Sequence, residues 1–109
     1  MISVVIPALN AERHLPAALT ALVPAAVNGI VREVIVVDGG STDHTRRIAD
    51  LSGADVIGCD PGRGLQLAQG AARARFPWLL FLHADTVLED GWEREAANFM
   101  HRVDIGERP

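Results

Sequence analysis

The sequence lacks two residue types on which many enzyme classes depend. None of the 109 residues is Lys or Tyr, so all ten basic residues are Arg. The absence of Lys excludes Walker-type phosphate loops and Schiff-base chemistry, since both need a lysine amine. A single cysteine, Cys59, excludes an internal disulfide and a cysteine zinc cluster, and it is compatible with a reducing compartment.

Basic patches and long apolar runs are also missing. The formal net charge is −4 and no segment concentrates Arg, which argues against nucleic acid as a partner. The most apolar stretch, residues 15–27, contains two prolines and is too short to span a bilayer, and the N-terminus has no basic segment of the signal-peptide kind. With 49% hydrophobic and 22% charged residues, the composition predicts one soluble, cytoplasmic domain.

Apolar, strand-like runs alternate with helical periodicity along the chain. The predicted strands are residues 2–6, 34–37, 54–57 and 78–82. The predicted helices carry apolar stripes at Leu15, Ala18, Leu19 and Leu22, at Ile48 and Leu51, at Leu65, Ala68 and Ala72, and at Trp92, Ala96, Phe99, Met100 and Val103. The runs 34–37 and 78–82 do not alternate with polar residues, which is typical of strands buried on both faces. The pattern predicts an α/β fold, an open, mostly parallel sheet with helices on both faces.

Polar residues follow the predicted strands at their carboxyl ends, where ligands bind in open α/β sheets. Asn10 and Glu12 follow the first strand, Asp38 ends the second, Asp60 follows the third, and His83 and Asp85 end the fourth. Such residues also make turns and helix caps, and that interpretation is favoured for Ser41, Thr42, Asp43 and Asp90. For Asp38 and Asp85 a place on the rim of the ligand crevice is favoured, because each closes an apolar strand.

The rim is acidic, so a phosphate ligand would need a divalent cation between it and the protein. The Asp85 carboxylate is a hard oxygen ligand suited to Mn²⁺ or Mg²⁺, and His83 lies two residues earlier on the same side of an extended segment. A strand-end histidine bonded to the backbone is an equally weighted alternative for His83. Other phosphate-binding classes fit poorly: the turn after the first strand has no glycine, a receiver domain needs a lysine, and a phosphatase loop needs Asp where His83 stands.

Four segments together carry a family resemblance. They are SVVIPALNAE, VIVVDGGSTDHT, GRG and FLHADT, in this order along most of the chain up to Trp92. The set resembles the family 2 glycosyltransferases of the GT-A fold, which show a P-x-x-N-E segment, a VVDDGSTD segment and a D-x-D motif. This sequence departs from that pattern in three places: one extra residue precedes Glu12, Gly39 replaces the second Asp, and His83 replaces the first Asp of D-x-D.

The resemblance implies a domain that binds a nucleoside-diphosphate sugar and transfers the sugar, usually with inversion. It assigns the nucleotide to residues Pro7, Ala8, Asn10, Glu12, Asp38, Gly39 and Arg63, and the metal to Asp85 and His83. For Arg63 the alternative, a solvated surface residue, is the favoured interpretation. Gly39 stands where the family usually has Asp, which affects the contact with the nucleotide base. His83 also stands where the family usually has Asp, which affects the affinity for the metal.

Members of this family are usually about twice this length, and the acceptor-binding half follows the D-x-D segment. The expectation is therefore that residues 1–109 form one partial domain, without the half that supplies the catalytic base and binds the acceptor, a saccharide or a lipid-linked group. Two alternatives remain open, a nucleotide-sugar-binding module without turnover and a structural or assembly domain. A homodimer is expected if the strand at residues 78–82 has an open edge.

Overall fold

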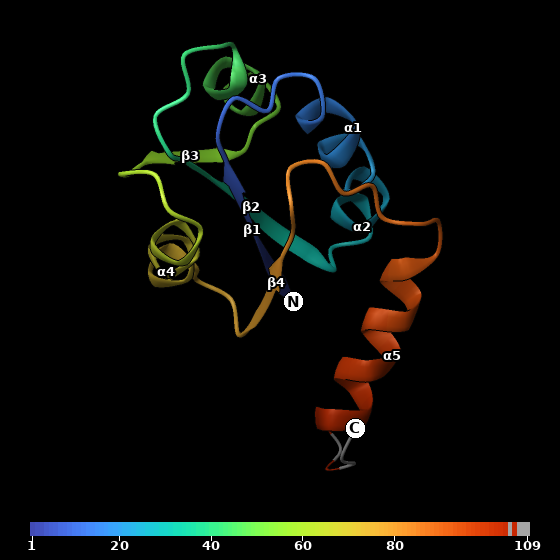
Figure 1. Ribbon diagram of the computed structural model, residues 1–109. Helices are drawn as coiled ribbons and strands as arrows, with labels where there is room; N and C mark the ends of the chain where they lie inside the picture. Colours follow the sequence, from blue (N-terminus) through green and yellow to red (C-terminus); the bar gives the residue numbers. More distant parts are fainter. Residues whose placement is uncertain (105, 107–109) are drawn as a thin grey trace.

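The computed structural model describes residues 1–104 and 106 and contains one four-stranded parallel sheet (Figure 1). The strands are β1 (Ile2–Ala8), β2 (Val31–Asp38), β3 (Asp55–Gly58) and β4 (Trp78–Phe81), in the spatial order β3-β2-β1-β4. The predicted α/β class is confirmed. The order reverses at β1, because the chain proceeds outward through β2 and β3 and then returns to place β4 on the other side of β1.

Helices cover both faces of this sheet. They are α1 (Leu15–Thr20), α2 (Val23–Val27), α3 (Thr45–Leu51), α4 (Arg63–Arg73) and α5 (Trp92–Asp104). In Figure 1, α4 lies alone on one side of the sheet, and α1, α2 and α5 lie on the other. The core follows this division. Val4 and Ile6 belong to the cluster that includes Leu15 and Met100, whereas Val5, Ile35 and Val37 pack with Leu67 of α4.

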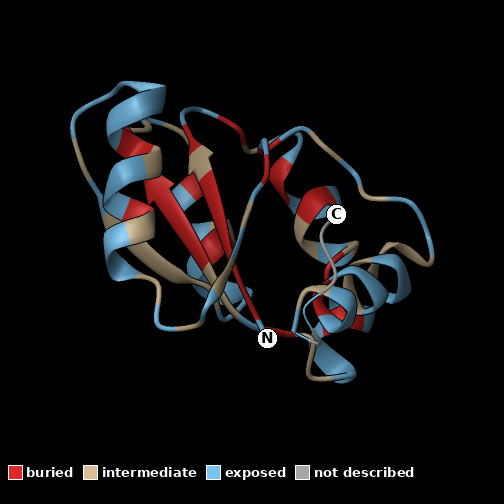
Figure 2. Ribbon diagram, turned by 90° about the horizontal axis from the view of Figure 1, so that it is seen from below, coloured by how far each residue is buried: buried red, intermediate tan, exposed pale blue. Residues whose placement is uncertain are grey.

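The two strands predicted to be buried on both faces differ. Ile35, Val36 and Val37 of β2 are fully buried, which confirms that prediction for β2 (Figure 2). For β4 the prediction is wrong: Leu79 and Phe81 are 40% and 48% exposed. The cause is the position of α4, which packs against β1 and β2 and leaves β4 uncovered on that face.

Proline lies inside the central strand β1, one residue beyond the predicted end of that strand. Pro7 pairs with Val37 in the β1–β2 register, although proline has no N–H to donate. Residues two apart in a strand direct their backbone groups to the same neighbour, and Val5 O accepts a hydrogen bond from Leu82 N at 3.0 Å, on the β4 side. The next ladder hydrogen bond toward β4 would need Pro7 N as its donor, and the regular pairing of β1 with β4 ends at Val5, before Pro7.

The helices differ from the predicted stripes at three points. In α3 the prediction for Leu51 is wrong: this last residue of the helix is 76% exposed, and only Ile48 of the predicted pair packs against the core. Residues 15–27 form two short helices, each with a proline in its first turn, where proline is tolerated. In α4 the predicted stripe at Leu65, Ala68 and Ala72 is wrong, since these three residues are exposed. The buried residues are Gln66 and Gly70 instead.

Gly70 explains how α4 reaches the sheet. A Cβ atom at this position would lie 2.2 Å from Val5 Cγ1, so only glycine allows the observed approach.

The last helix follows its prediction more closely. Met100 is buried, Trp92 and Ala96 pack against the core, and the rings of Trp78 and Phe99 meet edge to face at 5.9 Å. Within the described residues no helix is long and apolar enough to cross a membrane.

Candidate functional site

A pocket of 290 Å³ opens at the point where the strand order reverses, between the carboxyl ends of β1 and β4. This is the position at which open α/β sheets bind ligands. Its wall consists of the segment that follows β1, the first turn of α4, and the segment that follows β4. The lining residues are Pro7, Ala8, Leu9, Asn10, Ala11, His14, Arg63, Gln66, His83, Ala84 and Asp85.

Three ionisable side chains converge on one side of this pocket. The Arg63 guanidinium lies 3.3 Å from His83 Nδ1, and His83 Nδ1 lies 3.9 Å from a carboxylate oxygen of Asp85. The side chains of His83 and Asp85 are 52% and 66% exposed. Neither side chain is buried in the protein interior, so an imidazole nitrogen and a carboxylate are both available to a ligand.

The donor set fits a divalent cation that is shared with a phosphate. Among residues 1–104 and 106 there is no cluster of three or more His, Cys, Asp or Glu side chains that could enclose a metal. Asp85 and His83 together supply two ligands, which suits Mn²⁺ or Mg²⁺ because these ions commonly keep waters or substrate phosphates in their remaining positions. Arg63, beside them, offers the planar donor that phosphate oxygens prefer.

The loop after β1 is held by the loop after β2 through side-chain hydrogen bonds. Asn10 adopts a positive φ of 50°, which asparagine tolerates better than most residues. The bonds run from Asn10 N to Ser41 Oγ, from Ala11 N to Thr45 Oγ1, from Glu12 N to Asp43 Oδ2 and from Thr42 N to Asn10 Oδ1, over 2.8–3.2 Å. We call this set the loop clasp. It fixes the shape of the segment that lines the pocket.

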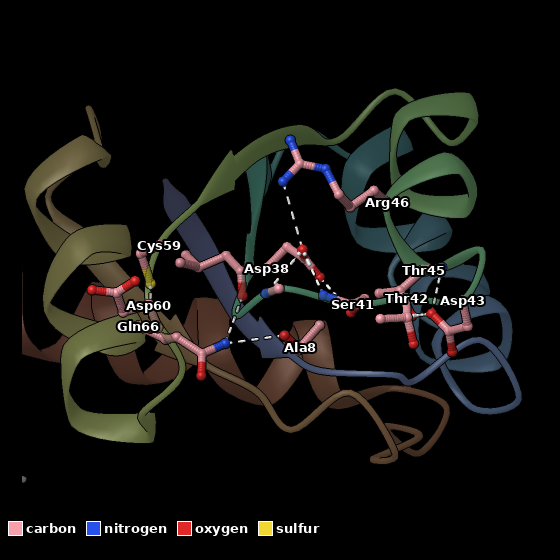
Figure 3. Close-up of polar contacts among 12 residues, drawn as sticks. Ala8, Asp38, Ser41, Thr42, Asp43, Thr45, Arg46, Cys59, Asp60 and Gln66 are labelled. Atoms are coloured by element: carbon pink, nitrogen blue, oxygen red, sulfur yellow. Dashed lines mark hydrogen bonds and ion pairs between the residues drawn. The ribbon is translucent and has the colours of Figure 1, made fainter.

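Asp38 lies beside the loop clasp and is not among the residues that line the pocket. Its side chain is fully buried, and its oxygens accept hydrogen bonds from Gly40 N, Ser41 N and Ser41 Oγ (Figure 3). A guanidinium nitrogen of Arg46 lies 3.5 Å away and compensates the carboxylate charge. In this structure the Asp38 carboxylate closes its own turn.

Asp43 carries a perturbed pKa. Hydrogen bonds from the Thr45 hydroxyl, then from the Thr45 and Glu12 N–H groups, outweigh the opposing effect of burial and lower the pKa of Asp43. This confirms that Asp43 makes a turn and a helix start. Glu12, predicted to bind nucleotide, bonds to Asp43 through its N–H, and its carboxylate lies 3.0 Å from His44 Nδ1.

Of the nine predicted site residues, six line the pocket: Pro7, Ala8, Asn10, Arg63, His83 and Asp85. Glu12, Asp38 and Gly39 do not, and they shape the neighbouring loops. Sequence analysis missed five pocket residues, of which two are polar, His14 and Gln66. His14 directly precedes α1, and its position two residues beyond the P-x-x-N-x-E segment was the available signal. Gln66 gave no signal, because a polar residue in a helix is ordinarily exposed.

Two other cavities lie at the opposite end of the sheet. One of 480 Å³ is mostly apolar and lies among α1, α2, α3 and the start of β2. The other, of 290 Å³, holds charged groups that already have partners, such as Glu33. Burial raises the pKa of Glu33, but hydrogen bonds from Arg75 N, Ser3 Oγ and the Arg75 guanidinium outweigh it and lower that pKa. Neither cavity brings together several polar or charged side chains that lack hydrogen-bond or ion-pair partners.

Comparison with known proteins identifies relatives of this chain. Glucosyl-3-phosphoglycerate synthase of Mycobacterium tuberculosis is 36% identical over 95 residues, which are 79% of this chain and 29% of that protein. A PGL/p-HBAD biosynthesis glycosyltransferase of Mycobacterium bovis is 37% identical over 95 residues, 81% of this chain and 36% of that protein. The chain thus spans about a third of the length of the curated relatives it matches.

Solved structures show the same likeness. The crystal structure of the M. tuberculosis synthase with Mn²⁺, UDP and glucosyl-3-phosphoglycerate superposes with a TM-score of 0.70 at 35% identity, over 77% of this chain and 33% of that one. The structure of S. aureus TarS 1–349 gives a TM-score of 0.84 at 25% identity, over 93% and 32%. Residues 3–105 match the family model described as glycosyl transferase family 2. The chain belongs to that family.

Proposed function

We propose that this chain forms the donor-binding part of a glycosyltransferase and binds a uridine-diphosphate sugar through a divalent metal. The observation that carries the proposal is the convergence of Arg63, His83 and Asp85 on the pocket between β1 and β4. The relative from M. tuberculosis has been crystallised with UDP and Mn²⁺, which supports uridine as the base and Mn²⁺ as the ion.

Each wall of the pocket has a role in this proposal. Asp85 and His83 would hold the cation, which as a Lewis acid stabilises the charge of the departing diphosphate. Arg63 pairs with the diphosphate oxygens. The segment Pro7–Asn10 contacts the base and ribose, while Glu12, Asp38 and Gly39 shape the loops around it.

Transfer needs a general base that deprotonates the acceptor hydroxyl. Among the described residues, Asp85 carries the one carboxylate that lines the pocket, and metal binding would occupy it. The base and the acceptor site are therefore proposed to come from outside the described residues. The same observation supports a second candidate, a module that binds the donor and does not turn it over.

Calorimetric titration with UDP, with and without Mn²⁺, tests the proposal. We expect binding that Mn²⁺ strengthens, and a stabilisation of about 2.7 kcal/mol at a UDP concentration about 100 times the dissociation constant. The absence of binding and of thermal stabilisation with UDP, GDP, TDP and CDP, with or without Mn²⁺, would overturn it. Release of sugar from UDP-glucose on addition of an acceptor would exclude the binding-only alternative.

A further inference from the structure

One buried amide side chain joins the ends of two strands to the start of α4, beside the pocket. Gln66 is only 5% exposed, although it lies in the first turn of α4. Its Nε2 donates to Val37 O at 2.8 Å and to Ala8 O at 3.1 Å (Figure 3). Its Oε1 accepts from Gly62 N at 3.2 Å. Both amide hydrogens are therefore used, and the carboxamide has one fixed orientation.

The partners of Gln66 are all backbone groups next to residues of the proposed site. Ala8 O and Val37 O lie at the carboxyl ends of β1 and β2, where the two loops joined by the loop clasp begin. Gly62 N directly precedes Arg63, which contacts His83. The side chain thus joins the ends of two strands to the start of the helix that carries the arginine.

Gly39 provides the space for this side chain. A Cβ atom at position 39 would lie 3.1–3.2 Å from the carboxamide atoms of Gln66, and φ of Gly39 is not in the left-handed region. The constraint on residue 39 is therefore steric. Gly39 and Gln66 form a matched pair, in which the carboxamide fills the volume that a side chain at 39 would take.

We propose that Gln66 is a positioning residue of the donor pocket: its carboxamide holds the ends of β1 and β2 against the first turn of α4 and so sets Arg63 beside His83 and Asp85. This inference rests on the function proposed above. Gln66 touches backbone only, so it acts on a ligand through Arg63 and the loop after β1.

The test compares Gln66→Met with Gln69→Met. Methionine keeps the length and approximate volume of glutamine and removes the amide, and Gln69 is an exposed residue of the same helix. We expect Gln66→Met to weaken UDP binding in the presence of Mn²⁺ by about tenfold or more, the range seen when a supporting hydrogen bond to a metal site is removed. Gln69→Met should bind like the wild type.

A second readout does not depend on the nucleotide. In the free protein, Gln66→Met should shift the NMR resonances of the Arg63 guanidinium and the His83 ring, because their contact is no longer fixed. A folded Gln66→Met protein with unchanged Arg63 and His83 resonances and unchanged UDP affinity would overturn the positioning role. Failure of the wild type to bind UDP would overturn the proposed function, and the resonances would still decide whether Gln66 positions Arg63.

If Gln66→Met does not fold, Gly39→Ala tests the same contact, because its methyl group presses on the carboxamide without removing it. We expect lower UDP affinity and shifted Arg63 resonances. In the double variant Gly39→Ala/Gln66→Ala the pressure is relieved, so the alanine at 39 should cost no further stability, while UDP affinity stays low. Recovery of wild-type affinity in the double variant would overturn the proposal.

Discussion

Two groups of polar side chains lie at the carboxyl end of the sheet, and they differ in what satisfies them. In the loop clasp and around Asp38, each carboxylate accepts hydrogen bonds from neighbouring loop groups. In the pocket, His83 and Asp85 are largely exposed, and their protein partners are Arg63 and each other. The same residue types thus maintain the loop structure where protein hydrogen bonds satisfy them. Where such bonds are few, they remain available to a ligand.

The largest expected effect separates two aspartates that each follow a strand. Asp38→Ala should lower the free energy of unfolding by about 3 kcal/mol, because it leaves the buried donors of its turn and Arg46 without a partner. Asp85→Ala should change it by no more than about 0.5 kcal/mol, as exposed substitutions usually do. Urea denaturation of both variants is the measurement, and equal losses would show that the distinction is wrong.

The reverse effect is expected on ligand binding. Asp85→Asn keeps the shape of the side chain and removes its charge, so the affinity for UDP with Mn²⁺ should fall by about tenfold or more, or at least about 1.4 kcal/mol. Asp90→Asn changes the net charge equally at an exposed loop position outside the pocket and should bind normally. Calorimetry that found the same metal-dependent affinity in Asp85→Asn would make Asp85 a turn residue.

The distinction between partnered and unpartnered groups extends to the backbone of β4. Its outer edge has no partner strand within the described residues, and Leu79 and Phe81 are exposed beside it. Such an edge pairs readily with another chain, so we expect the 109-residue chain to form a dimer. Leu79→Lys should weaken the dimer by about tenfold, about 1.4 kcal/mol. Light scattering after size exclusion measures this, and a monodisperse wild-type monomer at micromolar concentration would disprove the edge argument.

The smallest effect is an acid-sensitive loosening of the loop clasp. The folded pKa of Asp43 lies below its ordinary value, so its contribution to stability is present above the unfolded pKa of about 3.9 and is lost as the pH falls through the folded pKa. Thermal melts between pH 6 and pH 2 should therefore show less pH dependence in Asp43→Asn than in the wild type. Parallel curves for the two proteins would show that Asp43 is not the group that titrates.

Much of the fold was predictable because buried apolar residues recur in the sequence with the period of a helix or a strand. The apolar runs located the strands of the sheet, and the position of Asp85 after the fourth run located the pocket. The exposure of Phe81 was not predictable, because it depends on where α4 lies across the sheet. Asp38 was correctly placed at a strand end, but the direction of its carboxylate depends on Ser41 and Arg46.

Gln66 shows more clearly which features cannot be predicted from the sequence. Its burial results from hydrogen bonds to two carbonyl groups that lie 58 and 29 residues away along the chain. A local sequence pattern does not indicate contacts between residues so far apart.

The pairing of β1 with β4 has a consequence for how the protein folds. β1 is the first strand of the chain and Trp78 of β4 pairs with Ile2, so one wall of the pocket forms only after a long intervening segment has closed into a loop. Contacts between residues so far apart in the sequence slow folding, because the chain loses the entropy of closing the loop before the strand pairing stabilises it. Hydrogen exchange should accordingly find the amides of β4 opening more readily than those of β2, and a nucleotide that spans both walls would act as a cross-link that retains β4 in the native sheet.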